Sequence, residues 1–83
     1  MNILPLPPKP VTFDVKVIFD DGWYVAECDG LHIVTEADSF DALMARVWEI
    51  APEMAQENGL NIAAHALRLR FSFEDAWPAQ RVM

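Results

Sequence analysis

The sequence is poor in the residues that stabilise small secreted domains or that cradle phosphates. Its one cysteine, Cys28, excludes an intrachain disulfide, and we expect it to pack as a small hydrophobe. The three glycines, Gly22, Gly30 and Gly59, stand apart and make no phosphate-binding loop. No apolar run approaches the ~20 residues that span a bilayer, and the first residues lack signal-peptide features. We therefore expect a cytoplasmic protein with no membrane contact.

Basic residues are also scarce, because six Lys and Arg stand against thirteen Asp and Glu, a net charge of −7. Binding to a phosphate backbone needs a Lys/Arg surface, so this balance argues against nucleic acid as a ligand of the monomer. The acidity has two explanations: the protein binds a cationic partner, or the charge simply keeps it in solution. With 83 residues and 53% hydrophobic content, we expect a single domain with one core.

The chain divides into three parts: a proline-rich arm (residues 1–10), one α+β domain (residues 11–73) and a short tail (residues 74–83). The arm carries four of the six prolines, which remove backbone donors and favour an extended conformation. It is interpreted as a mobile terminus, a segment that docks on a neighbouring surface, or a polyproline ligand.

Apolar and polar residues alternate in Val11–Phe19 and Ala66–Phe73, which predicts two strands. Trp23–Cys28, which follows a turn signal, and Leu31–Glu36, which is rich in β-branched residues, are predicted as two more. Turn signals at Asp20-Asp21-Gly22 and Asp29-Gly30 join the first three strands into a meander. We expect an antiparallel sheet with one apolar face, and such a face needs a covering layer.

A helix that covers the sheet is predicted after the third strand. Asp38 and Ser39 are good N-caps, and Asn58-Gly59 is a C-cap signal. Between them, apolar residues recur at three- and four-residue spacing and form one stripe: Phe40, Leu43, Met44, Val47, Ile50, Ala51 and Met54. Pro52 conflicts with an uninterrupted helix, so we expect it to kink the helix or to begin a second one. The predicted order is β-β-β-α-β.

No set of residues identifies a reaction, and we predict no catalytic residue, metal or cofactor. Carboxylates that could hold two Mg²⁺ ions gather in the first half of the chain: Asp14, Asp20, Asp21, Glu27, Asp29, Glu36 and Asp38. Most of them fall in predicted turns or on outward strand faces, where carboxylates favour turns and solubility. His32 is expected on the outer sheet face, with no recognisable nucleophile beside it. The outer-face arginines Arg68 and Arg70 are expected to pair with Asp14 or Glu27.

The aromatic residues are the main candidates for a binding surface, because Trp23, Tyr24, Trp48 and Trp77 cannot all point into so small a core. Trp48 falls at the edge of the apolar stripe. An exposed Trp or Tyr often anchors an interface, and packing at the edge of the core is the alternative. The predicted partner or dimer interface combines aromatic and turn residues: Trp23, Tyr24, His32, Trp48, Asp20, Asp21 and Asp29.

The run DDGWYVAECDGL (residues 20–31), followed by VTEADSFDAL (residues 34–43), resembles the N-terminal signature of the HicB-like antitoxin family. It resembles more closely a short branch of related bacterial domains of unknown function. The resemblance spans about Thr12 to Leu69, and it implies a β-β-β-α-β domain with an incomplete ribonuclease H topology that is usually dimeric. The usual partner-contacting segment is shortened here to Cys28-Asp29-Gly30-Leu31.

For function, the resemblance implies protein binding. HicB-like proteins neutralise a small basic messenger-RNA-cleaving toxin by covering it, and many bind their own promoter through a C-terminal segment. Only ten residues follow the last predicted strand, so we expect no direct DNA binding. We predict a homodimeric, antitoxin-like module that masks a small basic toxin protein. The alternatives are a divalent-metal nuclease of ribonuclease H-like type and a self-associating domain without a toxin partner.

Overall fold

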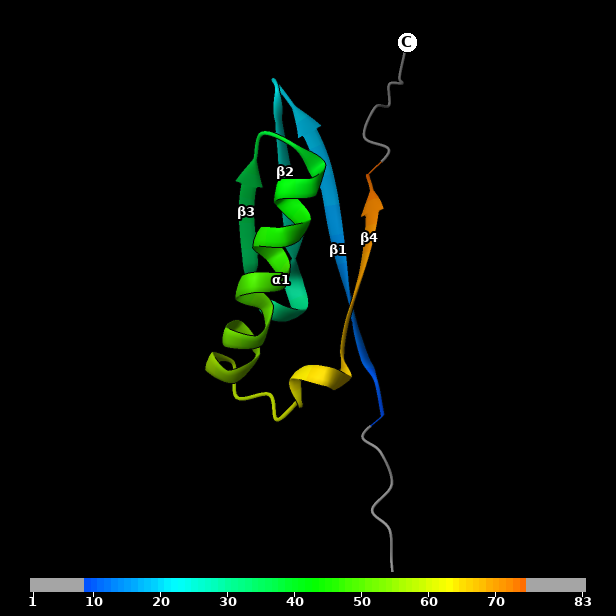
Figure 1. The fold of residues 1–83 in the computed structure, drawn as a ribbon, viewed down its shortest axis with the longest axis vertical. Coiled ribbons are helices and arrows are strands. Elements are labelled where there is room, and N and C mark those ends of the chain that lie inside the picture. The colour runs from blue at the N-terminus through cyan, green and yellow to red at the C-terminus, as the bar shows by residue number, and fades with distance from the viewer. Residues whose placement is uncertain (1–8, 75–83) are drawn as a thin grey trace, which may run out of the picture.

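The computed structural model describes residues 9–74, which form one sheet with a long helix packed on one of its faces (Figure 1). In chain order the elements are β1 (Val11–Asp20), β2 (Trp23–Cys28), the 3-10 turn η1 (Asp29–Leu31), β3 (Ile33–Ala37), α1 (Phe40–Glu57), the 3-10 turn η2 (Ala64–Ala66) and β4 (Leu67–Phe73). The strands lie in the order β3-β2-β1-β4. The predicted α+β class and the β-β-β-α-β order are confirmed.

The sheet is mixed, and this differs from the expected antiparallel sheet. β1–β2 and β2–β3 are antiparallel, but β4 runs parallel to β1, with Val11 opposite Leu67 and Val17 opposite Phe73. The direction of α1 explains the difference. β3 ends beside the turn that joins β1 and β2, and α1 carries the chain back along the sheet (Figure 1). β4 therefore starts at the same end of the sheet as β1.

The turn between β1 and β2 follows the sequence signal closely. Asp21 and Gly22 both have positive φ, 52° and 84°, in a two-residue loop closed by the pair Asp20 and Trp23. Positive φ at both positions defines a type I′ turn, whose twist matches that of the flanking strands. Aspartate and glycine are among the residues that adopt this conformation most readily.

The turn before β3 is longer than the two residues predicted. η1 includes Leu31, which is fully buried, and His32 ends the turn in the left-handed conformation with φ 56°. The His32 backbone N–H donates to the Asp29 carbonyl at 3.2 Å. Because the backbone reverses at His32, β3 begins at Ile33 instead of Leu31, and His32 does not lie on the outer sheet face as expected.

Asn58, the C-cap residue of α1, ties the end of the helix to this turn. Its Nδ2 donates to the carbonyls of Met54 at 2.8 Å and Leu31 at 3.1 Å. Its Oδ1 therefore faces His32 as an acceptor, and the Nδ1 of His32 donates to it at 2.8 Å. One side chain thus holds together two segments that lie 26 residues apart in the sequence.

Both ends of α1 are capped as predicted, and the helix is not split at Pro52. Ser39 Oγ accepts the N–H of Ala42 at 3.1 Å. At the other end, Gly59 has φ 75° and the Leu60 N–H reaches back to the Ala55 carbonyl at 2.9 Å, the hydrogen bond of a Schellman motif. Pro52 lies inside the continuous helix, where its missing N–H deprives the Trp48 carbonyl of a helical donor.

The core lies between α1 and the sheet face turned toward it. α1 lies over β2 and β3 and contributes a buried stripe at four-residue spacing: Leu43, Val47, Ala51 and Ala55. The other predicted stripe residues are half-buried flanks. From the sheet and η1 the buried partners are Val15, Val17, Ala26, Cys28, Leu31, Ile33 and Leu67. Cys28 is 1% exposed, so its prediction as a packed hydrophobe is confirmed.

Several predictions lie outside the described residues. These are the character of nearly all of the arm and the tail, and the position of Trp77. Within residues 9–74, no helix combines the length and the apolar character needed to cross a membrane.

Candidate functional site

The sheet has an open face, which is the face turned away from α1. Because successive strand residues point to opposite sides, the register of the four strands defines its members. They are mostly polar or charged, with four apolar exceptions in a group: Thr12, Asp14, Lys16, Ile18, Trp23, Val25, Glu27, Val34, Glu36, Arg68, Arg70 and Ser72. No element among residues 9–74 covers this face, so it is open to a partner.

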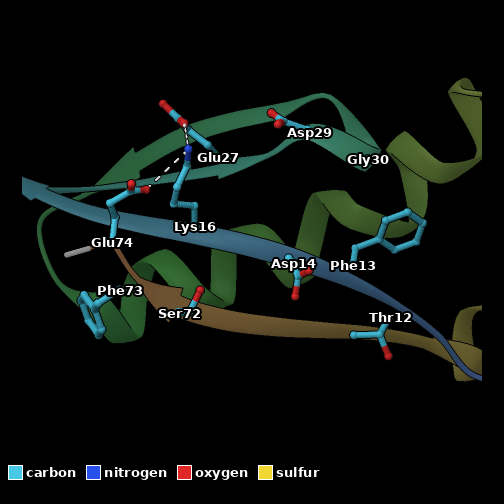
Figure 2. A pocket seen from close by; sticks show the side chains of 10 residues that line it. All are labelled: Thr12, Phe13, Asp14, Lys16, Glu27, Asp29, Gly30, Ser72, Phe73 and Glu74. Carbon is cyan, nitrogen blue, oxygen red and sulfur yellow. Dashed lines mark ion pairs between the residues drawn. The ribbon is translucent and has the colours of Figure 1, made fainter. Parts of the chain in front are cut away.

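An acidic hollow of about 890 Å³ lies on one half of the open face (Figure 2). Its lining comes from β1, β2, η1 and the end of β4: Thr12, Phe13, Asp14, Lys16, Glu27, Asp29, Gly30, Ser72, Phe73 and Glu74. Four of these side chains are carboxylates and one is a lysine. The hollow therefore carries a negative charge of its own, in addition to the acidity of the whole chain.

Lys16 lies between two of the carboxylates and is held by both. Its Nζ is 3.5 Å from Glu74 Oε1 and 3.6 Å from Glu27 Oε1 (Figure 2). The charges of Glu74 and Glu27 raise the pKa of Lys16 above its ordinary value. The three side chains together still carry one net negative charge, so the lysine does not neutralise the hollow.

A second ion pair crosses from β1 to β4. Arg70 Nε donates to Asp14 Oδ1 at 2.6 Å, and this hydrogen bond lowers the pKa of Asp14 below its ordinary value. The predicted pairing of Arg70 with Asp14 is confirmed. The prediction for Arg68 is wrong, because its Nη1 donates to the backbone carbonyls of His65 at 2.7 Å and Leu67 at 3.1 Å. Backbone acceptors lie closer to Arg68 than any carboxylate of the neighbouring strand.

Gly30 closes the hollow at the η1 end for a reason that the sequence did not reveal. A Cβ at this position would lie 2.6 Å from Cδ1 and 2.9 Å from Cε1 of Phe13. The ring of Phe13 therefore rests directly on the Gly30 backbone and fixes η1 against β1. The sequence pattern indicates only a turn residue at Gly30, and its φ is not positive.

An apolar strip occupies the other half of the open face, and we define it as Ile18, Trp23, Val25 and Val34. Ile18 lies opposite Val25 in the register of β1 and β2. Val34 is 75% exposed on the edge strand β3, and Trp23 is 47% exposed beside the β1–β2 turn. An exposed apolar group next to a charged one is typical of a protein-binding surface.

The structure separates the seven predicted interface residues into several places. Trp23, Asp20 and Asp21 lie together at the β1–β2 turn, at one end of the apolar strip. Asp29 lines the acidic hollow. The remaining three residues, Tyr24, His32 and Trp48, lie away from the open face.

Tyr24 faces α1 and is half-buried, with its ring centroid 4.7 Å from that of Phe19 and 6.3 Å from that of Phe40. His32 forms a hydrogen bond with the side chain of Asn58 at the end of α1. Trp48 is 43% exposed on α1, on the opposite side of the sheet.

The carboxylates do not converge as a metal site. Within residues 9–74, no three His, Cys, Asp or Glu side chains lie close enough together to hold a metal ion. The predicted set is spread from the β1–β2 turn to η1 at the far end of β2. Burial raises the pKa of the Cys28 thiol and holds it in the neutral form, so this residue is not an activated nucleophile.

Comparisons with known proteins agree with the fold and assign no activity. Residues 12–80 match a family model described as a domain of unknown function, DUF1902. The chain is similar to the crystal structure of a hypothetical protein from the extremely thermophilic bacterium Thermus thermophilus, with a TM-score of 0.68 and 30% identity. The similarity covers 77% of this chain and 93% of that one. No curated protein matches the chain.

Proposed function

This chain belongs to the DUF1902 family of domains of unknown function, and on that premise we propose that it is a non-catalytic module that binds a basic protein on its open face. The observation that carries the proposal is the juxtaposition on this face of the acidic hollow and the apolar strip. The strip offers apolar area to bury, and the hollow offers charges that a cationic surface complements. The net charge of −7 strengthens the same preference.

The two halves of the face have different physical roles. Trp23 and Val34 supply most of the exposed apolar area, and a buried tryptophan is a common source of binding energy. Three of the four carboxylates of the hollow, Asp14, Glu27 and Glu74, are held in place by Lys16 and Arg70 and stay exposed, so a basic partner meets a preorganised set of acceptors. Such charges mainly increase the association rate and the selectivity for basic partners.

We further propose that the role is antitoxin-like, in the cytoplasm, with a small basic toxin protein as the partner. Support comes from the resemblance of residues 20–31 and 34–43 to the HicB-like signature and from the element order that this resemblance implies. The open face lies on the same residues, because Trp23, Glu27 and Asp29 belong to the first of the two signature segments. An acidic face also suits a protein ligand better than DNA.

Where a small basic protein is encoded beside this chain, its binding tests the proposal directly. We expect Asp29→Lys, in the acidic hollow, to weaken the affinity about tenfold or more in isothermal titration calorimetry, because it replaces an attraction by a repulsion. The matched control is Glu53→Lys, which makes the same charge change on the exposed side of α1 and should change the affinity less than about twofold.

Trp23→Ala and Trp48→Ala make a second matched pair, one residue on the open face and one on the helix. Loss of affinity is expected for Trp23→Ala alone. Equal losses for the two variants of either pair would contradict the placement of the binding surface on the open face. Absence of a small basic protein encoded beside this chain, or of binding to it, would contradict the antitoxin-like role.

A further inference from the structure

We propose that the outer edge of β4 pairs antiparallel with β4 of a second copy, with Phe71 opposite Phe71 of the second copy. The proposal concerns the β4 edge of the sheet and does not depend on the proposed function. Arg68, Arg70 and Ser72 at this edge also belong to the open face. Three observations carry it: a free strand edge, an aromatic face that α1 leaves uncovered, and a charge pattern that fits one register.

The free edge follows from the strand order, since β4 is the last strand and pairs only with β1 among residues 9–74. The Glu74 N–H donates to the Val17 carbonyl at 2.8 Å, so even-numbered residues at this end of β4 direct their backbone groups toward β1. By alternation, Leu69, Phe71 and Phe73 direct theirs outward. A row of unpaired donors and acceptors of this kind is a template for another strand.

The helix-side face of β4 is rich in aromatic area that α1 does not cover, because α1 lies over β2 and β3. Phe73 is 58% exposed and Phe71 is half-buried. Phe40 contacts both, with ring centroids 5.1 Å from Phe73 and 6.2 Å from Phe71. Cross-strand aromatic and aliphatic neighbours would bury this area further.

Phe40 places one flank of α1 beside these rings, and Trp48 lies on that flank, two helical turns further along. The exposed residues of this side therefore come from the helix as well as from the strand. An apolar surface built from two elements around an open edge is typical of an association surface.

The charges select the register. In antiparallel pairing, residues of the same sheet face must lie opposite each other, so only shifts in steps of two are allowed. When Phe71 lies opposite Phe71 of the second copy, Arg68 lies opposite Glu74 of the second copy. The two-fold symmetry repeats this pair, so the interface contains it twice. Arg70 then faces Ser72, and Leu69 faces Phe73. Arg68 uses only Nη1 for its backbone carbonyls, so its other donors remain for a carboxylate.

The neighbouring registers are poorer. A shift of two residues in one direction places Arg70 opposite Arg70 of the second copy, and like charges directly opposite are destabilising. A shift of two in the other direction places Arg70 opposite Glu74, but it leaves Leu69 opposite a residue beyond Glu74 and shortens the overlap of the described strand. Of the three registers, the one centred on Phe71 places opposite charges across the edge and also pairs Leu69, Phe71 and Phe73 within the described strand.

The expected assembly is a continuous eight-stranded sheet around a two-fold axis perpendicular to it. This axis keeps both copies of α1 on one side of the sheet and both open faces on the other. The second copy is the chemically complementary occupant because the pairing matches basic with acidic residues of the same strand segment. Both open faces remain accessible in the dimer, so the assembly would present two of them.

Sedimentation velocity of the full chain tests the pairing. We expect a dimer, and we expect Arg68→Glu to weaken it about tenfold or more, because Glu then faces Glu74 of the second copy. The double variant Arg68→Glu with Glu74→Arg should recover part of the lost affinity, because it restores opposite charges across the edge but also places a second cation beside Lys16. Arg46→Glu, the same charge change on α1, should leave the dimer unchanged. Circular dichroism of each variant reports whether it is folded.

Three results would overturn the proposal. One is a monomer at all concentrations up to about 100 µM, a range that covers interfaces of moderate affinity. Another is a dimer whose affinity Arg68→Glu leaves unchanged. The last is a weakening by Arg68→Glu that the addition of Glu74→Arg does not lessen. If the wild type is a monomer whose Leu69, Phe71 and Phe73 amides resist hydrogen exchange, the edge is covered by the chain's own remaining residues and the second copy is excluded.

Discussion

At the scale of single residues, several side chains hold the strands, η1 and α1 in place around the candidate site. Gly30 gives room to Phe13, Asn58 binds two backbone segments, and Cys28 fills space in the core. None of the three has a role that its residue type alone specifies. Each role depends on a neighbour that is distant in the sequence, so the prediction for each can be tested by changing the residue or its neighbour.

Gly30→Ala should destabilise the protein by about 1–3 kcal/mol, because the added methyl group overlaps the ring of Phe13. Urea unfolding followed by tryptophan fluorescence measures the change. The double variant with Phe13→Leu should show a smaller additional loss than the single changes predict together, since the ring is no longer in the way. Full additivity of the two changes would contradict this packing.

Asn58→Ala should destabilise the protein by about 1–2 kcal/mol, since the part-buried carbonyls of Leu31 and Met54 each lose a donor. Asn61→Ala, the same chemical change in the exposed connection that follows, is the control and should change the stability by less than about 0.5 kcal/mol. Similar values for the two variants would show that Asn58 does not hold the end of α1 to η1.

Cys28 should react slowly with a thiol reagent in the native protein and rapidly in urea, because burial keeps the thiol protonated. The folded pKa lies above the unfolded one, so the associated stability is complete below the ordinary value of 9.0 and is lost as the pH rises beyond it. Unfolding experiments from about pH 7 to 10 measure this loss, and Cys28→Ala provides the control without the thiol. A stability difference between the two proteins that stays constant with pH would contradict the assignment.

At the scale of elements, the sequence predicts regular segments better than the connections between them. β1, β2 and both caps of α1 follow from short-range patterns, because alternation, capping residues and an Asp-Gly turn act locally. These local patterns did not predict η1, because it forms through the burial of Leu31 in the core, with His32 in a conformation of positive φ. The parallel pairing of β4 likewise depends on the direction in which α1 returns the chain.

Pro52 shows how packing can override a local preference. α1 continues through it because the neighbouring turns are held by buried Val47, Ala51 and Ala55. The Trp48 carbonyl that lacks a helical donor belongs to a partly exposed residue, so water can satisfy it. Pro52 does remove one helical hydrogen bond, as the sequence predicts. The contacts of the buried side of α1 with the sheet nevertheless keep the helix continuous.

Pro52→Ala should therefore stabilise the protein by about 1–3 kcal/mol, because it restores the missing hydrogen bond and removes the ring from the helix interior. Thermal and urea unfolding measure the difference. The control is Glu53→Ala, an exposed substitution one residue away, with an expected change within about 0.5 kcal/mol. Destabilisation by Pro52→Ala would mean that the ring makes packing contacts worth more than the hydrogen bond.

At the scale of the whole molecule, the open face was only partly visible from the sequence. Strand alternation identifies which residues point outward, and the acidic composition predicts the sign of their charge. The meeting of Asp29 with Glu74 in one hollow could not be predicted, because it requires the order of the strands and the parallel register of β4. The aromatic residues were expected at one interface, yet the fold places Trp23 and Trp48 on opposite sides of the sheet.

The central claim is that the open face binds a basic protein. An NMR titration of the isotope-labelled chain with a small basic protein, one encoded beside it where such a protein exists, tests this claim most directly. We expect the largest amide shift changes at Lys16, Val25, Glu27 and Val34, with α1 nearly unaffected. Saturable changes concentrated on the exposed side of α1, or no changes at all, would contradict the claim.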